Sequence, residues 1–353
     1  MDKRLFAKKI IDWYEQNKRI LPWRSTKDPY KIWLSEIILQ QTRIAQGLPY
    51  YQIFVKNFPD VKSLAAAKPD KVLRLWQGLG YYSRARNLHA CAKQIVKTLN
   101  GKFPSTFEEL KKLPGIGDYT AAAIASISFN EQVAVVDGNV FRVLARVFGI
   151  DKDIVSGAGK KYFFKISNEL VPKDSPDIFN QAVMEFGALH CTPQNPKCES
   201  CPFERSCVAN ARGLQKLLPV KTPKQKIRKR YFNYVVITHR GKLLMRKRNA
   251  GDIWNGLYDF YLIETKKSIK PETLLKQVKL SKLVIEEVSK VYKHILSHQQ
   301  LITRFILCSI ESLEDLQPLM NKDSLKFYSL PQVEKLPKPI LVNRFLKEWG
   351  YLD

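Results

Sequence analysis

The sequence lacks any apolar run near the roughly 20 residues that a helix needs to span a bilayer, so we expect no membrane anchor. Its N-terminus lacks the apolar core of a secretory signal, and no transit segment is apparent, so we expect a cytoplasmic protein. Hydrophobic residues still make up 45% of the 353 residues, which excludes a disordered chain and favours a globular one. The length suits two domains, each with its own core.

Acidic residues are scarce relative to basic ones. The chain has 33 Asp and Glu against 59 Lys and Arg, which gives a formal net charge of +26. A basic balance can simply aid solubility, but an excess this large favours a polyanionic partner. Because no segment is suited to a membrane, we expect that partner to be nucleic acid.

Cysteine is scarce too, yet four of the six cysteines lie within 17 residues, at Cys191, Cys198, Cys201 and Cys207. In a chain without an export signal, such a cluster indicates a metal site rather than disulfides. Four thiolates can hold a zinc ion or a [4Fe–4S] cluster. Zinc sites commonly pair two C-x2-C units, whereas this segment has one. The uneven spacing therefore favours the iron–sulfur cluster.

The composition changes along the chain in a way that indicates two kinds of domain. Residues 1–213 show helical periodicity, and a capping box at 105–108 predicts a helix that ends near Leu113. Segment 214–230 has the proline and basic residues of a linker. In residues 231–353, strand patterns alternate with helical ones. We therefore predict an all-α domain followed by an α+β domain.

A glycine-containing turn lies between two predicted helices, where residues 113–120 read Leu-Pro-Gly-Ile-Gly-Asp-Tyr-Thr. Gly115 and Gly117 allow backbone amides to approach a ligand closely, and the N-terminus of the next helix favours an anion. The alternative is an ordinary turn between helices.

Two carboxylates stand in contrasting surroundings. Glu36 lies on a predicted helix among apolar neighbours, so burial would raise its pKa and keep it protonated. Asp137 precedes Gly-Asn at the start of another predicted helix, whose N-terminus would keep it ionised. An acid and an anion are what hydrolysis of a glycosidic bond needs. Read alone, however, Glu36 is a solvated helix residue and Asp137 a cap or turn residue.

These motifs together resemble a family of DNA repair enzymes. The cysteine spacing, the 113–120 turn and the Val136–Val140 loop are similar to those of the endonuclease III superfamily of DNA glycosylases. The stretch Glu36–Thr42 resembles the acid-bearing helix of its adenine-specific mismatch branch, the MutY family. The resemblance covers residues 5–210 densely. It implies a helix-hairpin-helix that binds DNA phosphates and a [4Fe–4S] cluster on the four cysteines.

The same resemblance implies roles for individual residues in the chemistry. Glu36 would protonate the leaving base, and Asp137 would stabilise the sugar cation. Tyr119 and Asn139 would position these two groups. Superfamily members that also cut the strand carry a lysine where Tyr119 stands, and a phenol cannot form a Schiff base. The resemblance therefore implies a monofunctional enzyme.

Further residues match positions that contact DNA in the family. Gln41 and Tyr81 would intercalate beside the extruded base. Arg24, Gln181 and Glu185 would line the adenine pocket.

The C-terminal domain of the family is similar to Nudix hydrolases and senses 8-oxoguanine. Residues 231–353 lack the R-E-x-x-E-E core of the Nudix box, so we expect no nucleotide hydrolysis. The segment His294–His298 resembles the family's recognition loop, which implies that Ser297 and His298 contact the lesion. Leu296 stands where the family usually has phenylalanine.

The function implied by the resemblance is base-excision repair. A monomer would bind double-stranded DNA, flip out adenine paired with 8-oxoguanine or guanine, hydrolyse its glycosidic bond and leave an abasic site. Two alternatives stay open. One is a bifunctional glycosylase and lyase for oxidised pyrimidines, and the other is a non-catalytic iron–sulfur protein that binds DNA.

Overall fold

The computed structural model describes residues 2–222, 227–277, 280, 282–296, 298–310 and 312–352. The chain divides into two compact units. The first comprises residues 1–66 and 87–223, and the second comprises residues 67–86 and 224–353. No helix in the described residues is long and apolar enough to cross a membrane.

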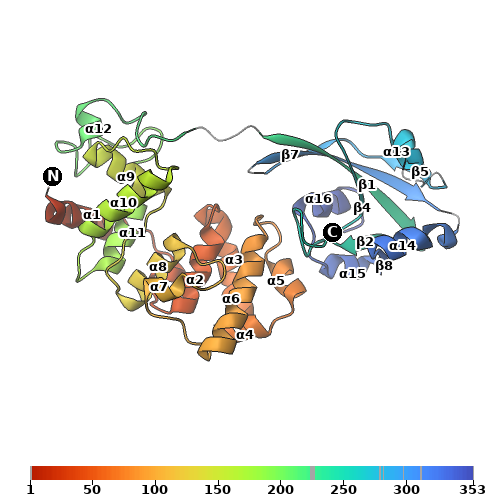
Figure 1. Cartoon of the computed structure of the whole chain (residues 1–353), viewed down its shortest axis with the longest axis horizontal. Helices are drawn as coiled ribbons and strands as arrows, with labels where there is room; N and C mark the ends of the chain where they lie inside the picture. Colours follow the sequence, from red (N-terminus) through yellow and green to blue (C-terminus); the bar gives the residue numbers. More distant parts are fainter. Residues whose placement is uncertain are drawn as a thin grey trace. The chain divides into compact units, whose positions relative to one another are not determined.

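Helices build the first unit (Figure 1). Several begin at side chains suited to that role: Asp2 and Ser156 accept hydrogen bonds from the backbone of the first turn, and proline opens α2 and α11. The elements are α1 (Lys3–Asn17), η1 (Pro22–Arg24), α2 (Pro29–Leu39), α3 (Ile44–Asn57), α4 (Val61–Ala66), α7 (Phe107–Leu110), α8 (Asp118–Phe129), α9 (Gly138–Phe148), α10 (Gly157–Leu170), α11 (Pro176–Leu189) and α12 (Val208–Ala211), with α6 (Ser83–Leu99) beginning in the second unit.

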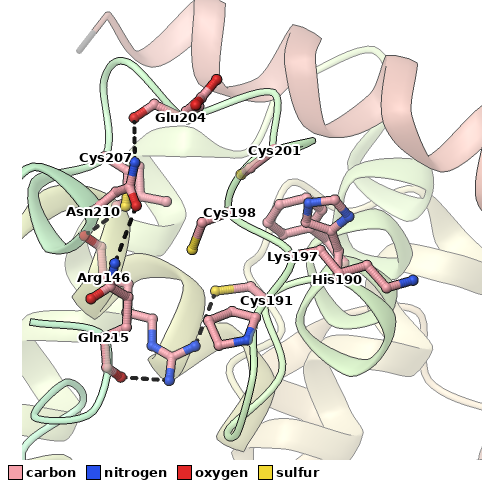
Figure 2. Close-up of a pocket in the computed structure, with 13 residues that line it drawn as sticks. Arg146, His190, Cys191, Lys197, Cys198, Cys201, Glu204, Cys207, Asn210 and Gln215 are labelled. Carbon is pink, nitrogen blue, oxygen red and sulfur yellow. Dashed lines mark hydrogen bonds between the residues drawn. The ribbon is translucent and has the colours of Figure 1, made fainter. Parts of the chain in front are cut away.

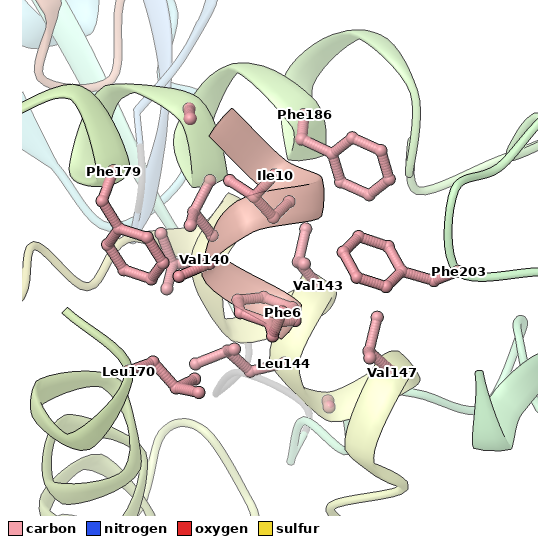
Figure 3. Packing of buried hydrophobic residues seen from close by; sticks show 14 of the residues in the cluster. Phe6, Ile10, Val140, Val143, Leu144, Val147, Leu170, Phe179, Phe186 and Phe203 are labelled. Carbon is pink, nitrogen blue, oxygen red and sulfur yellow. The ribbon is translucent and has the colours of Figure 1, made fainter. Parts of the chain in front are cut away.

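One apolar cluster joins the N-terminal helix α1 to helices α9, α10 and α11. Phe6 of α1 is fully buried, and its ring centroid lies 5.1 Å from that of Phe203, in the cysteine-rich segment (Figure 3). Phe186 of α11 packs against the same Phe203 ring, edge to face at 5.6 Å. Because Phe203 has no exposed surface, the cysteine-rich segment is anchored in the core of the first unit.

The second unit is a mixed sheet flanked by helices, which makes it α+β as predicted (Figure 1). The long strand β1 (Arg228–His239) pairs in parallel with β7 (Gln299–Ser309) and antiparallel with β2 (Lys242–Lys247). Arg240 and Gly241 both have positive φ, as the tight turn between β1 and β2 requires. The remaining elements are α5 (Pro69–Leu75), β3 (Tyr258–Asp259), β4 (Tyr261–Thr265), α13 (Pro271–Gln277), β5 (Val284–Val288), β6 (Tyr292–Ile295), η2 (Leu313–Leu316), α14 (Gln317–Asp323), β8 (Lys326–Ser329), α15 (Leu330–Lys335) and α16 (Ile340–Glu348).

The start of the predicted linker 214–230 is fixed to the first unit. The Arg146 guanidinium donates to the carbonyl oxygens of Gln215 and Leu218, and Ile154 N–H donates to Val220 O at 3.1 Å. Leu218 is buried in the core cluster. The basic residues Lys224 and Lys226 lie outside the described residues. The domain boundaries drawn from the sequence remain predictions.

Candidate active site

A cavity of about 450 Å³ opens among α2, α8, α9 and α11 in the first unit. Its volume lies within the range of small-molecule sites in proteins. Seven of the residues singled out in the sequence line it together: Arg24, Glu36, Tyr119, Asp137, Asn139, Gln181 and Glu185.

Glu36 projects from α2 and is only 8% exposed. Burial raises the pKa of its carboxyl to about 7, and the negative charge of Asp137 adds to this. A hydrogen bond with the Tyr119 hydroxyl and the charge of Arg24 lower it in part. Glu36 therefore carries a proton over a large part of the neutral range, which suits a general acid.

Asp137 caps helix α9. One carboxylate oxygen accepts from the backbone N–H groups of Asn139 and Val140, each at 2.8 Å. The other accepts from the Asn139 side-chain amide at 2.7 Å. Burial raises the pKa of Asp137, and these hydrogen bonds and the charge of Arg142 oppose that rise. The cap and the candidate catalytic carboxylate are thus the same group, with its orientation fixed by three donors.

The extended segment before Asp137 is held by a residue that the sequence did not single out. Asn180 of α11 is buried, and its Oδ1 accepts from Val135 N–H at 3.0 Å. Its Nδ2 donates to Val133 O at 2.8 Å. The Asn180 amide thus forms the two backbone hydrogen bonds that a neighbouring strand would otherwise form. It thereby fixes the position of the segment that leads into Asp137. No local signal in the sequence identifies the partner of this side chain.

A third carboxylate in the cavity is neutralised by two arginines. Glu185 is 1% exposed, and Arg24 binds it in a bidentate manner at 2.9 and 2.8 Å. Arg19 Nε donates to the same carboxylate at 2.7 Å. Burial alone would raise the pKa of Glu185, but the hydrogen bonds from Arg24 and Arg19 bring it to about 2. Glu185 is therefore a permanent anion, unlike Glu36, and Arg19 is a member of the site that sequence reasoning missed.

Gln181 lies one turn before Glu185 on α11 and also faces the cavity. The Tyr14 hydroxyl donates to Gln181 Oε1 at 3.4 Å. Gln181 Nε2 donates to Asp177 O at 3.3 Å. Both the oxygen and the nitrogen of the Gln181 amide therefore have a hydrogen-bond partner.

The glycine turn 113–120 joins α7 to α8. Gly115 has a φ of +75°, and a Cβ there would lie 2.6 Å from the Cβ of Asn87. Gly117 is the N-cap of α8 and no side chain caps the helix, so backbone N–H groups of the first turn are left for another acceptor. The geometry suits a phosphate group.

The two predicted intercalating residues share an uncommon backbone conformation. Gln41 has a φ of +57° and Tyr81 a φ of +47°, and both side chains are exposed. Left-handed conformations of residues other than glycine store strain and concentrate at functional sites. Gln41 belongs to the first unit and Tyr81 to the second.

The four clustered cysteines line one pocket, which Figure 2 shows with their sulfur atoms directed toward a common space. In the part of the chain that the structure describes, no three His, Cys, Asp or Glu side chains are grouped as ligands of one metal ion. Burial raises the pKa of the Cys201 thiol to about 12 and also raises that of Cys207. Phe203 N–H lies 3.4 Å from the Cys201 sulfur, and Arg146 Nη1 lies 3.5 Å from the Cys191 sulfur. Donors directed at sulfur suit thiolates, and a bound metal cluster is what would keep such buried thiols deprotonated.

The predicted recognition loop lies between β6 and β7 of the second unit. Leu296 N–H donates to Gln299 O at 2.8 Å, and Arg228 N–H donates to His298 O at 3.2 Å. The ring centroid of His294 lies 6.1 Å from that of Trp254. Ser297 lies outside the described residues.

Comparison with known proteins adds two family matches. Residues 34–173 match the family described as HhH-GPD superfamily base excision DNA repair protein, and residues 233–348 match the NUDIX domain.

Among curated proteins, the adenine DNA glycosylase of Buchnera aphidicola subsp. Schizaphis graminum is 35% identical over 343 residues, covering 95% of this chain and 96% of the relative. The adenine DNA glycosylase of Homo sapiens is 44% identical over 222 residues, covering 60% of this chain and 41% of the human protein.

Among solved structures, a thermostable thymine-DNA glycosylase aligns with a TM-score of 0.55 and 28% identity, covering 60% of this chain and 97% of that one. A non-covalent endonuclease III–DNA complex aligns with a TM-score of 0.52 and 21% identity, covering 61% and 100%. At that identity the likeness shows the fold alone.

Proposed function

The chain belongs to the adenine DNA glycosylases of base-excision repair, the family that its motifs predicted, and we propose that its target is adenine paired with 8-oxoguanine or guanine. Two relatives from Buchnera aphidicola align with nearly the full length of this chain, and both are named adenine DNA glycosylase. It is therefore a DNA N-glycosylase, and the non-catalytic alternative was wrong. We further propose that it is monofunctional and acts as a monomer on double-stranded DNA.

The observation that carries the mechanism is the buried Glu36 carboxyl, with a pKa of about 7, in the same cavity as Asp137. Glu36 donates its proton to N7 of an extruded adenine. The C1′–N9 bond then breaks, its electron pair leaves with the base, and positive charge develops on the sugar. The Asp137 carboxylate stabilises that charge, and water adds to C1′ and passes a proton to the Glu36 carboxylate, which leaves an abasic site. Asn139 and Tyr119 orient the two carboxyl groups.

The far side of the cavity would hold the base. The Gln181 amide oxygen can accept a hydrogen bond from the N6 amino group of adenine, which leaves N7 for the proton of Glu36. Glu185 binds Arg24 and Arg19 and offsets their positive charge, which would otherwise lower the pKa of Glu36 further. At neutral pH, Glu36 can therefore still carry a proton, whereas Glu185 is ionised.

Three features would bind the duplex. The amides after Gly115 and Gly117 hold a phosphate, and Gln41 and Tyr81 each insert into the base stack. The net charge of +26 supplies the sequence-independent attraction to DNA. The Nudix-like unit would read the lesion opposite adenine, with His298 and Ser297 on its recognition loop.

The residues that would hold a [4Fe–4S] cluster are the four cysteines of Figure 2. When bound, the cluster would cross-link the 191–207 segment. It would not transfer electrons in the reaction, because hydrolysis of a glycosidic bond involves no oxidation or reduction. Phe203 connects this segment to the core of the first unit, because its ring packs against Phe6 and Phe186.

Single-turnover base release tests the function. Duplexes with adenine opposite 8-oxoguanine, guanine or thymine would be treated with the wild-type protein and with Glu36→Gln. The exposed Glu272→Gln in α13 serves as a matched control. We expect release opposite 8-oxoguanine and guanine, strand breaks only after alkali, and no release by Glu36→Gln. Breaks without alkali, or release confined to oxidised pyrimidines, would instead support the lyase alternative.

A further inference from the structure

The loop that presents Tyr81 is built around a buried arginine at the start of α6. Arg84 is 9% exposed, and its guanidinium carbon lies 5.0 Å from the Trp76 ring centroid and 5.6 Å from the Tyr81 ring centroid. The planar cation therefore contacts one buried and one exposed ring at once. Such stacking is a property of guanidinium that an ammonium group does not share.

The same side chain also binds the backbone of the loop. Arg84 Nη2 donates to Leu79 O at 3.3 Å and to Gly80 O at 3.4 Å. The Trp76 indole N–H donates to Gly80 O at 3.0 Å. Two side chains thus converge on the carbonyl of the residue directly before Tyr81.

This loop needs such support because its backbone is strained. Gly80 and Tyr81 are consecutive left-handed residues, with φ values of +70° and +47°. Glycine adopts this conformation without cost, but a tyrosine does not. A Tyr81 ring that is 49% exposed has few packing contacts of its own to hold it in place.

The placement of Arg84 opposes the ordinary preference of a helix. A cation in the first turn of α6 faces the positive end of the helix dipole, and the first turn has no acidic residue to offset it. Burial lowers the pKa of Arg84 to about 10, so it is still charged at neutral pH. A buried charge at this position is unfavourable for folding, which indicates a role other than stability.

We propose that Arg84 is a positioning residue for base extrusion, which holds the Tyr81 ring and the Leu79–Gly80 carbonyls in the arrangement that enters the duplex. The proposal rests on the proposed function only in assigning Tyr81 as the inserted residue. Insertion unstacks a base step at a cost in free energy. A ring already held by Arg84 loses less conformational entropy on insertion than a free one.

The test separates extrusion from chemistry. A duplex with 2-aminopurine at the target position reports extrusion by its fluorescence, and single-turnover adenine release reports the whole reaction. Arg84→Lys keeps the charge but loses the flat face. We expect it to reduce both signals by about tenfold, in the range of a buried cation–π contact. Arg74→Lys in the last turn of α5 is the matched control and should leave both unchanged.

A double-mutant cycle shows whether Arg84 acts through Tyr81. Tyr81→Leu should cause a similar loss, and Arg84→Lys combined with Tyr81→Leu should be no slower than Tyr81→Leu alone. If the two losses multiply instead, Arg84 acts independently of the ring and the proposal is wrong. Equal extrusion by Arg84→Lys and wild type would also overturn it.

Two further measurements keep the result interpretable. If Arg84→Lys does not fold, Trp76→Phe removes the donor to Gly80 O and keeps a ring, and a smaller loss of extrusion in the same direction is expected. Absence of extrusion loss in a folded Trp76→Phe would then count against the proposal. A wild-type protein that extrudes 2-aminopurine but releases no adenine would overturn the proposed function and leave the role of Arg84 supported.

Discussion

Arg142 Nη2 lies 2.9 Å from Asn139 Oδ1, and this contact fixes which way the Asn139 amide faces. With its oxygen bound to a cation, the amide must direct Nδ2 at Asp137, and that bond measures 2.7 Å. Arg142 Nε also donates to Cys191 O at 2.7 Å. One arginine therefore connects Cys191, the first cysteine of the 191–207 segment, to the carboxylate that would stabilise the sugar cation.

Substitution of Arg142 should slow base release more than it weakens DNA binding. In Arg142→Gln the Asn139 amide is free to rotate, so Asp137 loses a fixed donor and a nearby positive charge. We expect a decrease of about 10- to 100-fold in single-turnover rate, the size typical of a lost partner that orients a catalytic or ligating group. The exposed Arg212→Gln is the control. An unchanged rate in a folded Arg142→Gln protein would show that Asn139 needs no such support.

The rate of base release should fall as the pH rises through about 7. Only the protonated Glu36 can donate to adenine, and burial places its pKa at about 7. Above that value the rate should decrease by about tenfold per pH unit, as expected for a single required acid. A pH profile of single-turnover rates opposite 8-oxoguanine measures this. A rate that stays level to pH 9 would mean that another group supplies the proton.

The same pKa shift predicts that Glu36 destabilises the fold at neutral and higher pH. Its folded pKa is raised from 4.5, so the folded state holds the proton more tightly and stability falls as the pH rises from about 4.5 to 7. The loss is on the order of 3 kcal/mol. Glu36→Gln should therefore unfold at a higher denaturant concentration than wild type at pH 8 and at nearly the same concentration at pH 4.5. Equal midpoints at pH 8 would show that the carboxyl is not desolvated.

Much of the fold was predictable because local signals coincide with tertiary structure. The sequence predicts a helical run over 32–41 with a start signal at Asp28-Pro29, and another helix after Asp137. Helix α2 begins at Pro29 and α9 begins at Gly138. The capping box was placed one residue early: Thr106 is the N-cap of α7, with Glu109 as its partner. That helix ends at Leu110 rather than near Leu113, because the glycine turn follows directly.

The parts of the site that escaped sequence reasoning are side chains whose role depends on distant partners. Arg19 contacts Glu185 across 166 positions of sequence, and Asn180 contacts Val135 across 45. Neither residue has a spacing or neighbourhood that sets it apart. The short strands β6 and β8 carry little local signal for a related reason, since their pairing with β7 and β2 defines them more than their composition does.

Loss of one cluster cysteine should destabilise the first unit before it alters the chemistry. Cys198→Ser removes a proposed cluster ligand from the segment that carries Phe203, whose ring packs on Phe6 and Phe186. We expect loss of the visible absorbance of the cluster and a lower thermal midpoint. Cys308→Ser is the matched control, because that thiol is buried in the second unit. A Cys198→Ser protein with the wild-type midpoint would show that the cluster does not support the core.

Replacement of Tyr119 by lysine should convert base removal into strand cleavage. Tyr119 lines the cavity beside Glu36 and beside Asp137, the carboxylate proposed to stabilise the sugar cation at C1′. After adenine leaves, the open abasic sugar presents an aldehyde at C1′. A neutral lysine amine can add to it and lose water to form an imine, from which the 3′ phosphate is eliminated. Borohydride reduces that imine, so Tyr119→Lys should be trapped on DNA and should break the strand without alkali. Tyr119→Phe is the control, and trapping of that variant to the same extent would assign the amine to Lys111 or Lys112 instead.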